Sequence, residues 1–242
     1  MRCNARYGVM VANYGGPMRL FEAESDGRTV LDRASEAGVG LTTGGRALVS
    51  GPIISSRTDI FANNEGYASS GRRLEAEAAA WDEQPTEVEE EANGVSQRGA
   101  SSASFSTSSS SLSMSSPGRS LGHTAATRVD RSNYMFVNLG DGSFRDDAAV
   151  VGLRDESNTG RGTALFDANG DGLIDIVYGN WNAQHRLFLQ QRDEAGNVSF
   201  IDAAPADMAE ASRVRTVIVA DFDNDGYEEI FYNNIPGENR LF

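Results

Sequence analysis

The amino-acid sequence predicts an all-β fold, a partial β-propeller of four-stranded blades with two full and two part blades, interrupted by a disordered insertion. Three observations predict it: a segment recurs at a fixed spacing, each complete copy divides into four strand-like elements, and a stretch of quite different composition separates the copies. A repeat of this size with four strands in each copy is typical of propeller blades.

Two independent markers give the period of the repeat. Asp167 and Asp221 lie 54 positions apart, and the Arg-Leu-Phe triplets that begin at Arg186 and Arg240 have the same separation. The four strands expected in one complete copy are short, rich in β-branched and aromatic residues, and bounded by Gly, Asn or Asp turns. They are Thr163–Phe166, Ile174–Tyr178, Arg186–Gln190 and Val198–Ala203.

Two further copies are less complete. One starts partway through a repeat at Tyr7 and reaches Phe21, and the other begins at Gly45. Asp59 of this second copy precedes the equivalent Asp175 by 116 positions, which is 62 more than one repeat. An insertion of about that length therefore interrupts the second copy.

The insertion divides the chain into three parts. Residues 1–67 form the first set of propeller blades, residues 68–132 the insertion, and residues 133–242 the blades that carry two acidic loops. The insertion opens with an acidic, Ala-rich run at 74–91, the best helical candidate in the chain, and continues into a nearly pure serine tract at 101–116. Such sequence cannot bury enough apolar surface to offset its ordering entropy, so we expect disorder. A tolerated loop insertion, a mis-spliced segment and a phosphorylated regulatory tract all stay open.

Composition excludes several classes of function. The formal net charge is −14, from 35 acidic and 21 basic residues. An acidic chain without a basic stripe is a poor candidate for binding nucleic acid and a better one for binding cations. No run approaches the ~18 apolar residues of a membrane-spanning helix, so we expect no membrane insertion. No signal peptide is visible at the N-terminus, and the single cysteine, Cys3, excludes an intrachain disulfide.

Two loops place oxygen-bearing side chains at positions 1, 3, 5 and 9: Asp167, Asn169, Asp171 and Asp175 in the first loop, and Asp221, Asp223, Asp225 and Glu229 in the second. Carboxylates packed so closely repel one another unless a cation lies between them. Ca²⁺ accepts six to eight oxygens, main-chain carbonyls included, so we expect Leu173 and Tyr227 at position 7 to contribute theirs. Gly172 and Gly226 at position 6 permit the sharp turn. The sequence predicts about two Ca²⁺ ions, and Mg²⁺ fits less well because it binds few carboxylates.

An EF-hand is the main alternative for these loops, because their first six positions match its pattern. An EF-hand needs a bidentate Glu at position 12 and a helix on each side. Here Tyr178 and Tyr232 stand at position 12, and the flanking sequences are strand-like. These departures disfavour the EF-hand. An acidic turn without metal is the other alternative, and two loops in register argue against it.

The remaining loops lack this pattern. In the interrupted copy only Asp59 remains, at the closing position, so we expect packing and hydrogen bonds to hold that loop without calcium. Asn138–Phe144 is typical of a Gly-rich hairpin turn, and its single aspartate does not make a metal site.

Several stretches resemble the FG-GAP/VCBS repeat family, the calcium-loop propellers related to the integrin α-subunit head, and are most similar to its cartilage acidic protein family. They are Gly44–Arg46 with Gly51–Ser56, Asp175–Asn182 with His185–Leu187, Arg215–Asp225, and Asn239–Phe242. The resemblance covers the chain except for about residues 68–132. It implies a seven-bladed propeller, secreted or on the cell surface, that binds Ca²⁺, contacts a protein or extracellular-matrix partner, and has no catalytic activity.

The sequence therefore predicts a calcium-binding module for protein–protein or matrix interaction, in which the metal is structural. The chain departs from the family in holding only two blades and two part blades, so a fragment is expected. Two alternatives stay open: the accessory propeller of a larger hydrolase, and a truncated non-functional product. His123 and His185 are far apart in sequence, and no nucleophile with a base is evident, so no zinc site or catalytic triad is expected.

Overall fold

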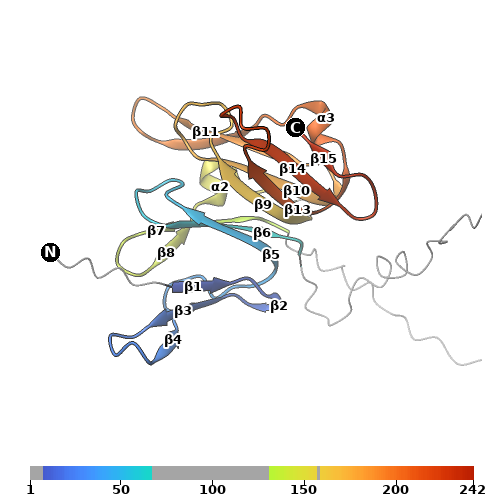
Figure 1. Ribbon diagram of the computed structural model, residues 1–242. Coiled ribbons are helices and arrows are strands. Elements are labelled where there is room, and N and C mark those ends of the chain that lie inside the picture. Colours follow the sequence, from blue (N-terminus) through green and yellow to red (C-terminus); the bar gives the residue numbers. More distant parts are fainter. Residues whose placement is uncertain (1–7, 67–130, 157–158) are drawn as a thin grey trace, which may run out of the picture. The chain divides into compact units, whose positions relative to one another are not determined.

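The computed structural model describes residues 8–66, 131–156 and 159–242 (Figure 1). Its regular structure is almost entirely β, which confirms the all-β fold class. The disorder and the helical candidate expected between residues 68 and 130 lie outside the described residues. The strands form three antiparallel sheets in the described part of the chain.

The first sheet has the order β1-β3-β4 and is small. Its strands are β1 (Gly8–Val11), β3 (Arg19–Ala23) and β4 (Val30–Asp32). The intervening strand β2 (Tyr14–Pro17) leaves this sheet and pairs with the first strand of the next one. The segment from β1 to β3 therefore forms backbone hydrogen bonds in both the first and the second sheet.

The second sheet has the order β2-β5-β6-β7-β8. Its further strands are β5 (Thr42–Gly51), β6 (Asp59–Asn64), β7 (Tyr134–Asn138) and β8 (Phe144–Asp146). Ile60 of β6 lies opposite Phe136 of β7, so the interruption of the repeat falls between two hydrogen-bonded neighbours. The predicted hairpin turn joins β7 to β8, where the Leu139 N–H donates to the Ser143 carbonyl at 3.0 Å. The short helix α2 (Ala148–Val151) follows.

The third sheet contains two successive groups of strands. The first group is β9 (Gly160–Phe166), β10 (Asp175–Ala183), β11 (Arg186–Arg192) and β12 (Val198–Asp202). The second group is β13 (Ser212–Ala220), β14 (Glu229–Asn234) and β15 (Arg240–Leu241), preceded by the short helix α3 (Ala206–Ala209). All four strands predicted for the complete copy are present as β9 to β12.

The main difference from the predicted strands is the length of β10, which was expected to end at Tyr178. Its first half pairs with β9 and β11, whereas its far end pairs with β13, where Trp181 lies opposite Arg213. The pairing of β10 with β13 itself contains a register shift between Trp181 and Ala183. Local propensity cannot reveal this extension, because the partner strand belongs to the next repeat along the chain.

Three apolar clusters pack the successive groups of strands against each other. One joins β1, β3 and their loops to β6 and β7, the next joins β6 and β7 to β10 and β11, and the last joins β9 and β10 to β13 and β14. Close approach between β9 and β13 requires glycine, because a Cβ on Gly162 would lie 2.4 Å from the Val217 nitrogen. The acidic loops leave the same strands at their far ends.

Candidate metal centre

The second acidic loop connects β13 to β14 and brings four carboxylates together. Oxygen atoms of Asp221, Asp223, Asp225 and Glu229 all lie within 4.8 Å of one another. Among the described residues this is the one group of at least three acidic, histidine or cysteine side chains that meets this criterion. The three aspartates are exposed and Glu229, the first residue of β14, is half-buried.

The backbone of this loop orients its own carboxylates. Asp221 accepts hydrogen bonds from the backbone N–H groups of Asp225, at 3.1 Å, and Gly226, at 3.0 Å. Asp225 in turn accepts one from the Tyr227 N–H at 2.8 Å. The turn needs a left-handed backbone at two positions, and Asn224 (φ 62°) and Gly226 (φ 95°) adopt it. Asn and Gly are the residues that take this conformation most readily.

The first acidic loop connects β9 to β10 and has the same turn. Asp167 accepts hydrogen bonds from the Gly170, Asp171 and Gly172 N–H groups at 2.8 to 3.1 Å. Asn169 replaces one carboxylate, and its amide donates to Asp171 Oδ2 at 3.0 Å. Its three carboxylates do not form a group of the kind found in the second loop. The two loops therefore share a backbone but differ in how closely their ligand atoms converge.

The closing residue of the first loop, Asp175, is fully buried at the start of β10. It accepts hydrogen bonds from the Ala168 N–H at 2.8 Å and from the Gln190 N–H at 2.7 Å. Burial raises its pKa, and the negative charges of Asp171 and Asp167 raise it further. A cation bound here removes this penalty, because it stabilises the ionised carboxylates. The contribution of Gln190 could not be predicted from the sequence, because its backbone N–H reaches Asp175 only when β10 and β11 pair.

The loop between β5 and β6 keeps the closing aspartate, Asp59, but lacks the acidic side chains at the earlier loop positions. Asp59 is fully buried and accepts hydrogen bonds from the Ile54 and Ser55 N–H groups at 2.8 and 2.7 Å. It also accepts one from the Ser55 hydroxyl and one from the Asn138 N–H, on the neighbouring strand β7. Hydrogen bonds hold this loop, as predicted. The closing carboxylate therefore has a structural role of its own.

The donor set of the second loop fits a hard cation of the size of Ca²⁺. Ca²⁺–oxygen distances are 2.3–2.6 Å, so two ligand atoms on opposite sides of one ion lie about 4.8 Å apart. The four carboxylates satisfy this limit. Of the ten predicted ligands, the side chains of eight stand in the two loops as described, and the carbonyl oxygens of Leu173 and Tyr227 stay predictions.

A hydrogen-bonded pair of the buried His185 and the half-buried Ser212 lies apart from these loops. His185 Nε2 is 2.8 Å from the Ser212 hydroxyl oxygen, and the Ser212 hydroxyl donates to Asn234 Oδ1 at 2.7 Å. The Asn180 N–H donates to His185 Nδ1 at 3.0 Å, so the neutral ring carries its proton on Nε2. That proton points at Ser212, and the imidazole cannot accept the serine proton. The arrangement is a structural hydrogen-bond chain.

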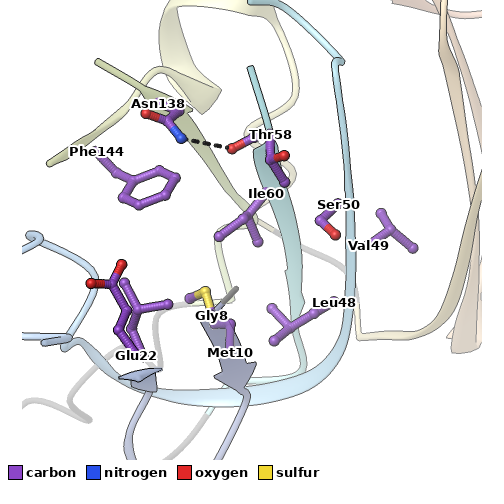
Figure 2. Close-up of a pocket in the computed structure, with 11 residues that line it drawn as sticks. Gly8, Met10, Glu22, Leu48, Val49, Ser50, Thr58, Ile60, Asn138 and Phe144 are labelled. Carbon is purple, nitrogen blue, oxygen red and sulfur yellow. Dashed lines mark hydrogen bonds between the residues drawn. The ribbon is translucent and has the colours of Figure 1, made fainter. Parts of the chain in front are cut away.

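A cavity of about 490 Å³ lies between the first and second sheets (Figure 2). Its walls combine apolar side chains, among them Met10, Leu20 and Leu48, with polar groups. Thr58 and Asn138 are joined by a hydrogen bond of 3.2 Å, and Glu22 is the one charged residue among the described residues that line it. A single carboxylate with no titratable neighbour in this lining does not make a catalytic constellation.

None of the helices among the described residues is long and apolar enough to cross a membrane.

Comparison with known proteins gives two findings. The FG-GAP-like repeat family matches residues 167–232, a range that begins at the first acidic loop and includes the whole of the second. Cartilage acidic protein 1 from Homo sapiens is 37% identical to this chain, and the proteins of the same name from Mus musculus and Xenopus tropicalis are 36% and 35% identical.

Each of these three alignments covers 99% of this chain and 29% of the relative. The chain thus spans about three tenths of the length of the relatives that it matches. The family resemblance expected from the sequence is confirmed: the chain carries an FG-GAP-like repeat and is similar, over almost all of its own length, to cartilage acidic protein 1.

Proposed function

We propose that this chain is a calcium-binding section of a β-propeller that serves as an interaction module, with the metal in a structural role. The observation that carries the proposal is the convergence of Asp221, Asp223, Asp225 and Glu229 within 4.8 Å in an FG-GAP-like repeat. Among the described residues, no arginine or histidine forms an ion pair or hydrogen bond with these four side chains. A bound metal ion is therefore the simplest way to neutralise their negative charges.

The propeller interpretation rests on the repeated pairing of the strands. β5 to β8 and β9 to β12 are each four antiparallel strands in chain order, which is the arrangement of a propeller blade. β1, β3 and β4 then supply part of a preceding blade, and β13 to β15 part of a following one. The apolar clusters lie between successive groups, as blade-to-blade packing requires.

Calcium acts in this proposal on the connection between the first two strands of a blade. Asp221 follows β13 directly and Glu229 begins β14, so one ion held by both joins the two strands at their open end. The metal supplies positive charge, and the loop supplies oriented oxygens. We propose the same role for Asp167, Asn169, Asp171 and Asp175 between β9 and β10, which gives about two ions per chain.

The partner is proposed to be a protein or a component of the extracellular matrix, and the location to be extracellular or at the cell surface. The name of the relatives refers to cartilage, and FG-GAP-like repeats are typical of extracellular propellers. The module is proposed to be non-enzymatic. The histidine–serine pair supports this, because its tautomer does not activate the serine.

Calcium titration of the full chain, by isothermal calorimetry and by thermal melting, tests the proposal. We expect about two bound ions, a higher melting temperature in Ca²⁺ than in EDTA, and a weaker response to Mg²⁺. Asp225→Asn should remove one ion, and Asp171→Asn should remove the other. The matched control is Asp141→Asn, an exposed aspartate in the β7–β8 turn that should leave the stoichiometry unchanged. Absence of binding heat together with identical melting curves in Ca²⁺ and EDTA contradicts the proposal.

A further inference from the structure

Four arginines gather at the ends of the strands that lie opposite the acidic loops. The guanidinium carbons of Arg161, Arg215 and Arg213 lie 4.8, 5.1 and 5.8 Å from the centre of the Trp181 ring. Arg46 forms an ion pair with Glu65, which forms a second ion pair with Arg161. We call Arg46, Arg161, Arg213 and Arg215 the arginine cluster.

The cluster is built from equivalent positions of successive repeats. Tyr14, Glu65 and Trp181 each directly follow an asparagine at corresponding positions of successive repeats. Each of them meets an arginine of the next repeat: Arg46 lies 4.0 Å from the centre of the Tyr14 ring, Arg161 pairs with Glu65, and Arg215 stacks on Trp181. The repeat itself therefore brings the arginines to one place.

The strands carry opposite charge at their two ends. Arg161 is the second residue of β9, and Asp167 directly follows its last residue. Arg215 lies near the start of β13, and Asp221 directly follows that strand. In both β9 and β13 the arginine lies near the start of the strand and the acidic loop follows its end. The arginine cluster is therefore separated from the acidic loops by the length of a strand and does not belong to the candidate metal centre.

The cluster gathers four positively charged side chains in a chain whose net charge is −14. Within the cluster, Glu65 forms ion pairs with two of the four arginines, Arg46 and Arg161. Burial lowers the pKa of Arg161 to about 10, Glu65 offsets part of this, and the charges of Arg46 and Arg215 lower it further. Arg161 is only 9% exposed, and its Nε has no hydrogen-bond partner among the described residues.

We propose that the arginine cluster binds an oxyanion, a carboxylate, sulfate or phosphate group, on the face formed by Trp181 and the strand ends. A guanidinium presents its N–H donors in a planar fork that matches such groups in pairs. Three of the four arginines are already oriented by contact with the Trp181 ring, so little side-chain entropy is lost when the anion binds. Arg46 and Arg213 are partly exposed and give the anion access.

A purely structural role is the alternative that the test must separate. In that case the arginines only hold successive repeats together through Glu65, Tyr14 and Trp181, and added anions weaken these contacts by screening. An anion site instead saturates with ligand, and it discriminates among anions at constant ionic strength.

Trp181 offers a direct reporter of this site, because the chain has only two tryptophans. In the full chain carrying Trp81→Phe, the emission of Trp181 is followed while NaCl is replaced at constant ionic strength by sodium sulfate, phosphate or succinate. Calcium is left out of the phosphate arm. We expect a saturable change with at least one of the three anions, and their relative affinities identify the preferred oxyanion.

Arg213→Gln and Arg215→Gln in the same background should each raise the apparent dissociation constant about tenfold or more, while circular dichroism shows the folded state. Arg28→Gln removes the same charge from an exposed turn far along the sequence and should change nothing. An emission change that does not saturate, or that is the same in Arg215→Gln and Arg28→Gln, overturns the proposal. Calcium stoichiometry is unaffected by either result, so this test is independent of the proposed calcium site.

Discussion

At the scale of single residues, the closing carboxylates Asp59 and Asp175 share a structural role. Asp59 and Asp175 are both fully buried, and both accept hydrogen bonds from their own loop and from a neighbouring strand. Only Asp175 is accompanied by further acidic side chains at positions 1 and 5. The hydrogen-bonding role therefore does not depend on the additional oxygens, whereas the proposed metal site does.

Asp59→Ala should lower the free energy of unfolding by about 3 kcal/mol, because it leaves several buried donors without an acceptor. Urea unfolding measures the change. Asp26→Ala is a matched control: Asp26 also accepts three hydrogen bonds, from Arg28 and Thr29, but it is exposed. Water replaces those bonds in the variant, so the loss of Asp26 should lower the free energy of unfolding much less than the loss of Asp59. Equal costs in the two variants contradict the structural role of the buried carboxylate.

His185 should make stability depend on pH. Burial lowers the pKa of His185 from 6.5 to about 4, and the charge of Arg240 contributes. The unfolded chain therefore binds a proton between pH 6.5 and pH 4 that the folded chain does not, and stability falls as pH falls through this window. The loss amounts to about 3 kcal/mol at its limit. Urea unfolding from pH 7 to pH 4 should show a steeper decline for the native chain than for His185→Gln; parallel curves contradict the assignment.

At the scale of elements, the same triplet has different surroundings in different repeats. Leu20 of β3 and Leu241 of β15 hold the same place in their Arg-Leu-Phe triplets. Leu20 is 6% exposed and packs in the cluster between the first and second sheets, whereas Leu241 is 56% exposed. The repeat pattern in the sequence therefore predicts the position of a side chain within its repeat. Whether that side chain is buried depends on the strands that pack against it.

Leu20→Ala should lower the free energy of unfolding by about 2–4 kcal/mol, because it removes buried methyl groups and leaves a cavity. Leu241→Ala removes the same atoms from an exposed position and should cost less than about 1 kcal/mol. Chemical denaturation of the two variants under identical conditions measures the difference. Similar losses in both indicate that the side chain of Leu241 is covered in solution.

At the scale of the whole molecule, the two acidic loops belong to the last two groups of strands in the described part of the chain. Both loops lie within or at the ends of β9, β10, β13 and β14, and the first sheet carries no comparable loop among its described residues. Any stabilisation by calcium is therefore expected to be local before it is global.

Hydrogen exchange with and without Ca²⁺ should show this locality. Protection should rise in residues 167–175 and 221–229 and in the adjoining strand ends, because the ion opposes opening of these loops. Backbone amides of β1, β3 and β4 should change little. A uniform rise over all sheets instead indicates that the described strands unfold as one cooperative unit, with calcium acting on global stability.

Much of the fold follows from short-range sequence pattern. The period, the four strands of one copy and the turn glycines were predictable, because strand alternation and turn chemistry are local properties. The end of β10 was not predictable, because Trp181 is strand only through its pairing with Arg213 of the next repeat. The role of His185 was also hidden, since its tautomer depends on Asn180 and Ser212, which approach it through folding.

The sequence by itself determined the all-β repeat and the identity of the acidic loops, because both rest on residue types at fixed spacings along one stretch of chain. Tertiary structure alone decided which carboxylates converge and which arginines meet. Asp221 and Glu229 close on each other only when β13 and β14 pair, and Arg46, Arg161 and Arg215 come from three repeats. The physical reason is the same in both cases: charge interactions depend on distance in space, and strand pairing sets that distance.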